Sequence, residues 1–124
     1  MARLTRLLAP LAALAVAGVT LSSCGTGSAV SDARNSCRMV KQALALQAQS
    51  EVAGISAASR TTLEGKAMNE LLKATPMAAA ATSADGSWNA LMTTINESER
   101  VPLQNLVPAL TRLCKVADSS SPYL

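Results

Sequence analysis

The chain has 124 residues and no internal repeat, a length that accommodates one small domain. Hydrophobic residues make up 49% of it, with alanine prominent among them, but aromatic residues make up only 2%, so a modest core of small side chains is expected. The net charge of +3 nearly vanishes once Arg3 and Arg6 are set aside, because nine basic residues then face eight acidic ones. This removes the electrostatic argument for nucleic-acid binding, which requires a basic patch or stripe.

Residues 1–23 have the three parts of a secretory signal peptide. Arg3 and Arg6 precede an apolar run from Leu7 to Leu21, and small residues follow it. A transmembrane anchor is the alternative, but a membrane-spanning helix needs about 20 apolar residues. This run is shorter and contains Pro10. We therefore expect residues 1–23 to be removed.

The apolar run ends in Leu21-Ser22-Ser23-Cys24, which resembles the lipobox of bacterial lipoproteins. Small residues let the backbone enter a peptidase groove in extended form, and only a thiol can form a thioether to diacylglycerol. The resemblance implies that Cys24 is the lipid attachment site and the first residue of the mature chain. It also implies an anchor on the outer face of the cytoplasmic membrane. A soluble secreted protein, cut for instance after Ala17 and keeping a free Cys24, is the alternative.

The number of cysteines bears on whether Cys24 carries a lipid. Three cysteines leave one unpaired, which in an exported protein calls for an explanation. If Cys24 carries lipid, Cys37 and Cys114 remain as a pair, and export permits a disulfide between them. Such a bridge closes a long loop and would stabilise the fold by at most about 4 to 4.5 kcal/mol. Two reduced, buried cysteines are the alternative.

After Cys24 the chain is expected to begin with a short flexible tether, residues 24–31, made of small residues. The first helix is predicted from about Asp32 past Gln49, with Gly54 marking its end. Its main apolar stripe repeats every three or four residues. The stripe comprises Cys37, Val40, Leu44, Ala48, Val52 and Ile55.

A second apolar set in this helix, Met39, Ala43 and Leu46, lies roughly opposite the main stripe. If the helix is central in the domain, both faces belong to the core. If it is peripheral, the second face is an exposed patch that suits a protein partner or a lipid contact. The sequence leaves this choice open.

The second helix carries a capping-box pattern in which Thr61 caps the helix and Glu64 reaches back. Pro76 is expected to break it, with a short further helix restarting there and ending near Ala84. The apolar side of the second helix contains Leu63, Ala67, Met68, Leu71 and Leu72.

Turn residues at 85–87 precede a third main helix, and Asp85 or Ser87 is expected to cap it. The apolar spacing of this helix is that of Trp88, Leu91, Met92 and Ile95.

The last helix should open at Pro102, while Pro108 should kink or split it. Residues 118–124 are expected to form a disordered tail. The shared apolar face of the last helix contains Leu103, Leu106, Val107, Leu110, Leu113, Cys114 and Ala117.

Together these elements predict an all-α fold, a small antiparallel bundle of about four helices over residues 32–117. In up-down order the two ends of the bundle lie at the same side. Cys37 in an early turn of the first helix can then meet Cys114 in the last turn of the final one.

Catalytic chemistry finds little support in the sequence. The chain contains no histidine, which removes Ser-His and Cys-His pairs and histidine zinc sites. It also lacks a CxxC motif and a phosphate-binding glycine loop that follows a strand. Trp88 can be a ligand-stacking residue or a core anchor, and its helical spacing favours the core. We predict no enzyme, no catalytic residues, no cofactor and no metal.

Overall, the chain resembles the small alanine-rich lipoproteins of high-GC bacteria. We expect a lipid-anchored, non-enzymatic binding module of the cell envelope. Its partners would be the membrane, through the anchor, and another envelope protein. The alternative is a carrier of an apolar small molecule in a cavity between the helices. An apolar interior pocket of several hundred Å³ would favour the carrier, and a filled core would argue against it.

Overall fold

A computed structural model of the chain describes residues 26–122, and the side chains of residues 29–122. Four α-helices follow one another: α1 (Thr26–Ser50), α2 (Ala57–Ala84), α3 (Asn89–Glu97) and α4 (Leu103–Asp118). A single 3-10 turn, η1 (Gly86–Trp88), joins α2 to α3. Since the described residues contain no strand, the predicted all-α, four-helix fold is confirmed.

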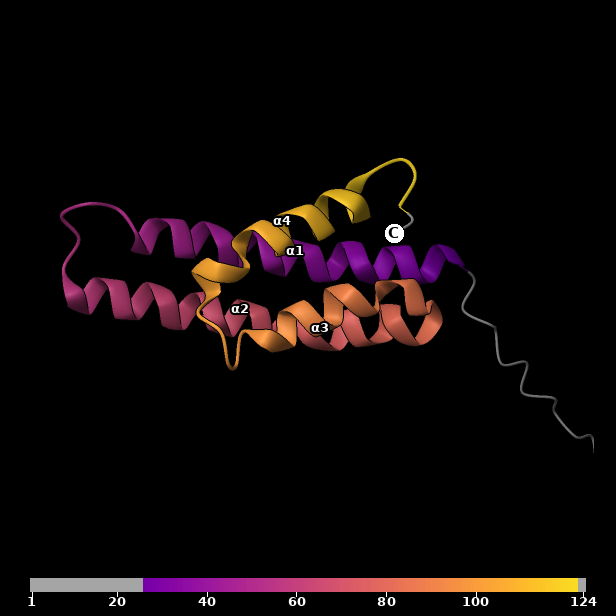
Figure 1. The fold of residues 1–124 in the computed structure, drawn as a ribbon, viewed down its shortest axis with the longest axis horizontal. Helices are drawn as coiled ribbons and strands as arrows, with labels where there is room; N and C mark the ends of the chain where they lie inside the picture. Colours follow the sequence, from indigo (N-terminus) through magenta and orange to yellow (C-terminus); the bar gives the residue numbers. More distant parts are fainter. Residues whose placement is uncertain (1–25, 123–124) are drawn as a thin grey trace, which may run out of the picture.

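The long helices α1 and α2 form an antiparallel hairpin that frames the bundle (Figure 1). Helix α3 runs back beside α2, and α4 crosses obliquely over α1. Small side chains let α1 and α2 approach closely, because the distance between helix axes follows the size of the residues at the contact. The buried small residues are Ala29, Ala33 and Ala43 in α1 and Ala67, Ala74, Ala78 and Ala81 in α2.

One hydrogen bond shows how close this approach is. The hydroxyl of Ser36 in α1 donates to the backbone oxygen of Ala74 in α2 at 3.0 Å, and Ser36 is fully buried. A short serine side chain reaches a neighbouring helix backbone only where no large residue separates them. Alanine therefore determines the geometry of the hairpin.

Larger side chains fill the space where α3 and α4 meet the hairpin. Trp88 is fully buried and is accompanied by Leu71, Leu91, Ile95 and Leu110. Trp88 is thus a core residue, which settles the choice between a core anchor and an exposed stacking surface.

Both apolar faces of α1 belong to the core. Ala43 is fully buried, and Met39 and Leu46 pack partly buried against the same cluster. Helix α1 is central because it contacts both α2 and α4. Of the two interpretations that the sequence left open, the core interpretation holds.

The first helix differs from its predicted bounds at both ends. It begins at Thr26, so residues 26–31 are helical and the predicted tether over 24–31 is wrong there. The fully buried Ala29 gives this early turn a core contact that composition alone does not reveal. The helix ends at Ser50, and Val52 is 57% exposed in the following turn, where Gly54 has φ +84°. Val52 therefore does not belong to the apolar stripe.

The second helix begins earlier than its capping-box pattern suggested. Ser56 is the N-cap, and its hydroxyl accepts a hydrogen bond from the backbone N–H of Ser59 at 3.1 Å. The hydroxyl of Thr61 instead donates back to the carbonyl of Ala57. The predicted start at Thr61 is wrong because a serine five residues upstream caps the helix.

Helix α2 also continues through Pro76, so the predicted restart there is wrong. Proline deprives the carbonyl of Leu72 of its helical partner. Leu72 and Pro76 are both exposed, so the unpaired carbonyl lies on the solvent side, where water can satisfy it. A proline on a solvent-exposed helix face therefore destabilises the helix much less than one that faces the core.

Helix α4 opens at Pro102, as predicted, and includes Pro108 without being split. Pro108 is exposed, which gives the same explanation as for Pro76. The helix ends at Asp118, one residue beyond the predicted domain boundary at 117. The backbone N–H of Ser119 donates to the carbonyl of Val116, so the predicted disordered tail over 118–124 is wrong at its first two residues. Residues 123–124 lie outside the described part.

The disulfide between Cys37 and Cys114 is confirmed, with a Cα–Cα distance of 5.4 Å. Replacing both residues by alanine should lower the free energy of unfolding by about 2–4 kcal/mol, because the unfolded chain regains the entropy of a long loop. Urea denaturation followed by helical circular dichroism measures this. Cys24→Ala is the matched control, since it removes a thiol but no bridge. An equal loss in the control would contradict the prediction.

Candidate functional site

The residues that carry the lipobox, Leu21 to Cys24, lie outside the described part of the chain. The assignment of Cys24 as the lipid attachment site therefore stays a prediction, as does the signal peptide over residues 1–23. Within residues 26–122, no helix is long and apolar enough to cross a bilayer.

Three connections hold the second half of α4 on α1. The disulfide joins Cys37 to Cys114, and both residues are buried. One turn further along α1, Lys41 pairs with Asp118 at the end of α4. These contacts bring together two helix segments that are far apart in the sequence.

Arg34 supplies the third connection. Its Nε donates to the carbonyl of Ala117 at 2.8 Å, and its Nη2 donates to the carbonyl of Ser119 at 3.2 Å. These carbonyls lie at the C-terminal end of α4, where backbone oxygens lack helical partners and carry partial negative charge. Arg34 thus satisfies and partly neutralises this helix end.

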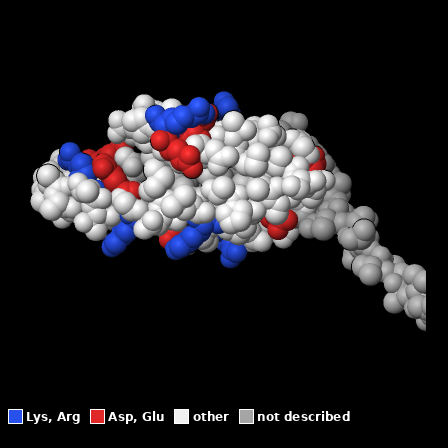
Figure 2. Space-filling model, turned by 90° about the horizontal axis from the view of Figure 1, so that it is seen from below, with Lys and Arg blue, Asp and Glu red and all other residues white. Residues whose placement is uncertain are grey.

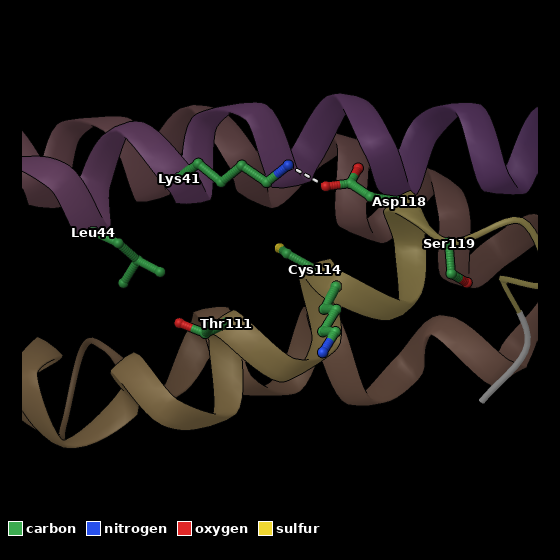
Figure 3. A pocket seen from close by; sticks show the side chains of 7 residues that line it. Lys41, Leu44, Thr111, Cys114, Asp118 and Ser119 are labelled. Atoms are coloured by element: carbon green, nitrogen blue, oxygen red, sulfur yellow. Dashed lines mark hydrogen bonds and ion pairs between the residues drawn. The ribbon is translucent and has the colours of Figure 1, made fainter.

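A groove of about 560 Å³ lies between α1 and α4 beside these connections, and we call it the α1/α4 groove. Figure 3 shows Leu44 and Thr111 extending into the space between the two helices, with Lys41 directed along α1 to Asp118. The groove opens to solvent, so it is not the enclosed interhelical cavity that a carrier of apolar molecules would need. Its lining residues are Lys41, Leu44, Thr111, Cys114, Lys115, Asp118 and Ser119.

The charges at the rim of the groove are unequal. Lys41 and Asp118 form an ion pair, and Lys115 belongs to none of the ion pairs within residues 29–122. The rim therefore carries one ammonium group in excess. Elsewhere, basic and acidic side chains are mixed on the face that Figure 2 shows, which has no continuous basic stripe.

The carboxylates of the described residues are not arranged for catalysis or metal binding. Glu70 pairs with Lys73 and Glu97 with Arg100, each within one helix turn at the surface. Asp85 caps η1: its Oδ1 accepts from the backbone N–H of Ser87, which lowers the pKa of this carboxyl below its usual 3.8. In the described part of the chain, no three His, Cys, Asp or Glu side chains lie together in a way that could hold a metal ion.

Sequence reasoning did not identify the α1/α4 groove, although a signal for it was present. Once Cys37 and Cys114 are paired, residues one turn away on each helix must face one another. Lys41 is one turn after Cys37, and Thr111 and Asp118 lie about one turn to either side of Cys114. The predicted disulfide thus indicated which side chains lie near one another, but not the angle between the helices on which the groove depends.

Arg34→Ala should lower the free energy of unfolding by about 1–2 kcal/mol, because two helix-end carbonyls lose a charged donor. The substitution should accelerate hydrogen exchange of the backbone amides in the last turn of α4 more than that of the amides in α2. Arg38→Ala is the control, since Arg38 is exposed and bonds only to Asn35 within its own helix. Equal exchange rates in the two variants would contradict a specific role for Arg34.

The α1/α4 groove is therefore the candidate site, with the Cys37–Cys114 bridge at its base and one unpaired ammonium, Lys115, at its rim. Any function assigned to it depends on the chemistry of these residues. Comparisons of the chain with protein-family models, with curated proteins and with solved structures find no match.

Proposed function

We propose that the chain is a lipid-anchored protein of the bacterial cell envelope whose helical bundle is a non-enzymatic binding module. It is held on the outer face of the cytoplasmic membrane through Cys24. The pairing of Cys37 with Cys114 supports this assignment, because it leaves Cys24 as the odd cysteine of an exported chain. The thiol follows an apolar run and two small residues, the pattern that a lipoprotein peptidase requires.

The early start of α1 has a consequence for the proposed anchor. Helix α1 begins at Thr26, so only Gly25 separates Cys24 from it. In the proposed arrangement the bundle is held against the bilayer with almost no spacer. The membrane-proximal end then comprises the start of α1, the α2–α3 connection and the end of α4, which Figure 1 shows on one side.

The α1/α4 groove is the observation that carries the binding function. Its volume of about 560 Å³ lies within the range of small-ligand sites, and such sites combine apolar walls with a few polar groups. Lys41 follows Thr26 by fifteen residues along α1, which at 1.5 Å per residue is about 22 Å. In the proposed arrangement the groove therefore extends from the membrane-proximal end, where Asp118 and Ser119 lie, to about this distance along the bundle, and it is open to the envelope space.

Cys24→Ala should release the protein from the membrane fraction, because a single thiol carries the whole anchor. Detergent phase partitioning and labelling with radioactive palmitate measure the attachment. The matched control is the Cys37→Ala/Cys114→Ala chain, which loses two cysteines but retains Cys24 and should stay in the membrane. Palmitate labelling of Cys24→Ala, or its retention in the membrane after removal of residues 1–23, would refute the anchor.

A photocrosslinking amino acid at Thr111, inside the groove, should give a discrete adduct in intact cells. The same amino acid at the neighbouring Arg112, which is exposed and outside the groove lining, should give none. Mass spectrometry of the intact purified protein distinguishes the two positions. Identical patterns from both positions would argue against the groove as the binding surface.

A further inference from the structure

We infer that the α1/α4 groove binds a single-chain amphiphile with a carboxylate head, a long-chain fatty acid in chemical class. The hydrocarbon chain would lie over Leu44 and Cys114, and the carboxylate would lie beside the ammonium of Lys115. The inference rests on the proposed binding function and specifies its ligand.

The lining of the groove favours a hydrocarbon chain. Leu44 is half-buried and faces the groove, and Cys114 contributes its sulfur atom at the base. The methylene stems of Lys41 and Lys115 add apolar surface while their ammonium groups stay in water. A ligand that lies in the groove therefore contacts mainly carbon and sulfur along its length.

The open side of the groove selects an amphiphile over a wholly apolar molecule. A purely apolar ligand would leave part of its own surface in water, which cancels much of the hydrophobic gain. An amphiphile buries its chain and keeps its head hydrated, so an open groove with a charged rim suits it. This is why the ligand class differs from that of an enclosed carrier.

The charge at the rim selects a monoanion. Lys41 and Asp118 neutralise one another, and one ammonium, that of Lys115, remains to balance one negative charge. The negative end of α4 would repel an anion, but Arg34 donates to two of its carbonyls and weakens that repulsion. A carboxylate, with a single charge at neutral pH, matches this rim better than a phosphate monoester, which carries up to two.

The test uses the mature chain, from residue 24 onward, carrying Cys24→Ser, so that neither the apolar signal segment nor an attached lipid occupies the groove. Isothermal titration calorimetry measures the binding of sodium laurate below its critical micelle concentration. The comparison ligands are dodecyl phosphate, dodecyltrimethylammonium and acetate, which change the head or remove the chain. Laurate should bind saturably and more tightly than the other three. Shortening the chain to decanoate should weaken binding by about threefold to fourfold per methylene lost.

Lys115→Glu should weaken laurate binding by about fivefold or more, since it replaces an attractive charge with a repulsive one. It should also strengthen binding of dodecyltrimethylammonium. Lys66→Glu is the matched control, because it makes the same charge change at an exposed position of α2 outside the groove lining. Leu44→Gln, checked for folding by circular dichroism, should weaken laurate and dodecyltrimethylammonium alike.

Absence of saturable laurate binding, or equal effects of Lys115→Glu and Lys66→Glu, would overturn the inference. Tighter binding of dodecyl phosphate than of laurate would overturn the carboxylate assignment. If laurate fails to bind while the Thr111 adduct and the release of Cys24→Ala are both observed, only the ligand class is rejected. If Cys24→Ala, after removal of residues 1–23, stays in the membrane while laurate binds as described, the anchor is rejected and the ligand site stands.

Discussion

The disulfide between Cys37 and Cys114 is the constraint on which the arrangement of α4 depends. Helix α4 crosses α1 obliquely, and it lacks the continuous alanine contact that joins α1 to α2. A covalent bond at the crossing sets the register of the two helices, and the contacts of Lys41 and Arg34 follow from that register. The α1/α4 groove exists because α1 and α4 diverge beside their crossing point, where the disulfide prevents the two helices from sliding along one another.

The core is packed with one tryptophan and no phenylalanine. Stripes of alanine bring α1 and α2 so close together that the hydroxyl of Ser36 donates directly to the backbone carbonyl of Ala74. Trp88 then fills the space between the hairpin and α3, and its indole Nε1 is buried with no hydrogen-bond partner in the described part of the chain. Many of the buried residues of this core are small, and in small domains with a modest core a disulfide adds stability.

The proposed function and the fold depend on the same pair of cysteines. An even pair within the bundle leaves Cys24 as the odd cysteine, which supports the proposed anchor. The bridge also fixes a mildly cationic, apolar groove on the side of a bundle that would be held close to the bilayer. A protein of this kind would meet single-chain amphiphiles at the membrane surface, where the proposed ligand class is found.

Much of the fold was readable in the sequence, because helical periodicity records which residues face the core. The apolar positions of the last helix and the spacing after Trp88 predicted α4 and α3 correctly. The pairing of Cys37 with Cys114 was predicted from the number of cysteines that remain once Cys24 is set aside. Predictions from helix breakers and caps failed where local preference depends on context. Helix α2 continues through Pro76 because this proline lies on an exposed face, and Ser56 caps α2 five residues before the expected residue.

The sequence by itself determined the helical class, predicted the pairing of Cys37 with Cys114 and contains the lipobox-like pattern at Cys24, since each depends on residue type and local spacing. Only the tertiary structure decided that the second face of α1 is core, because that depends on α1 lying between α2 and α4. It also decided that α1 begins at Thr26, within the predicted tether, and that Ala29 is buried in the core. Only the tertiary structure decided the α1/α4 groove as well. Its walls come from residues about seventy positions apart in the sequence, and no local pattern fixes the angle at which two helices cross.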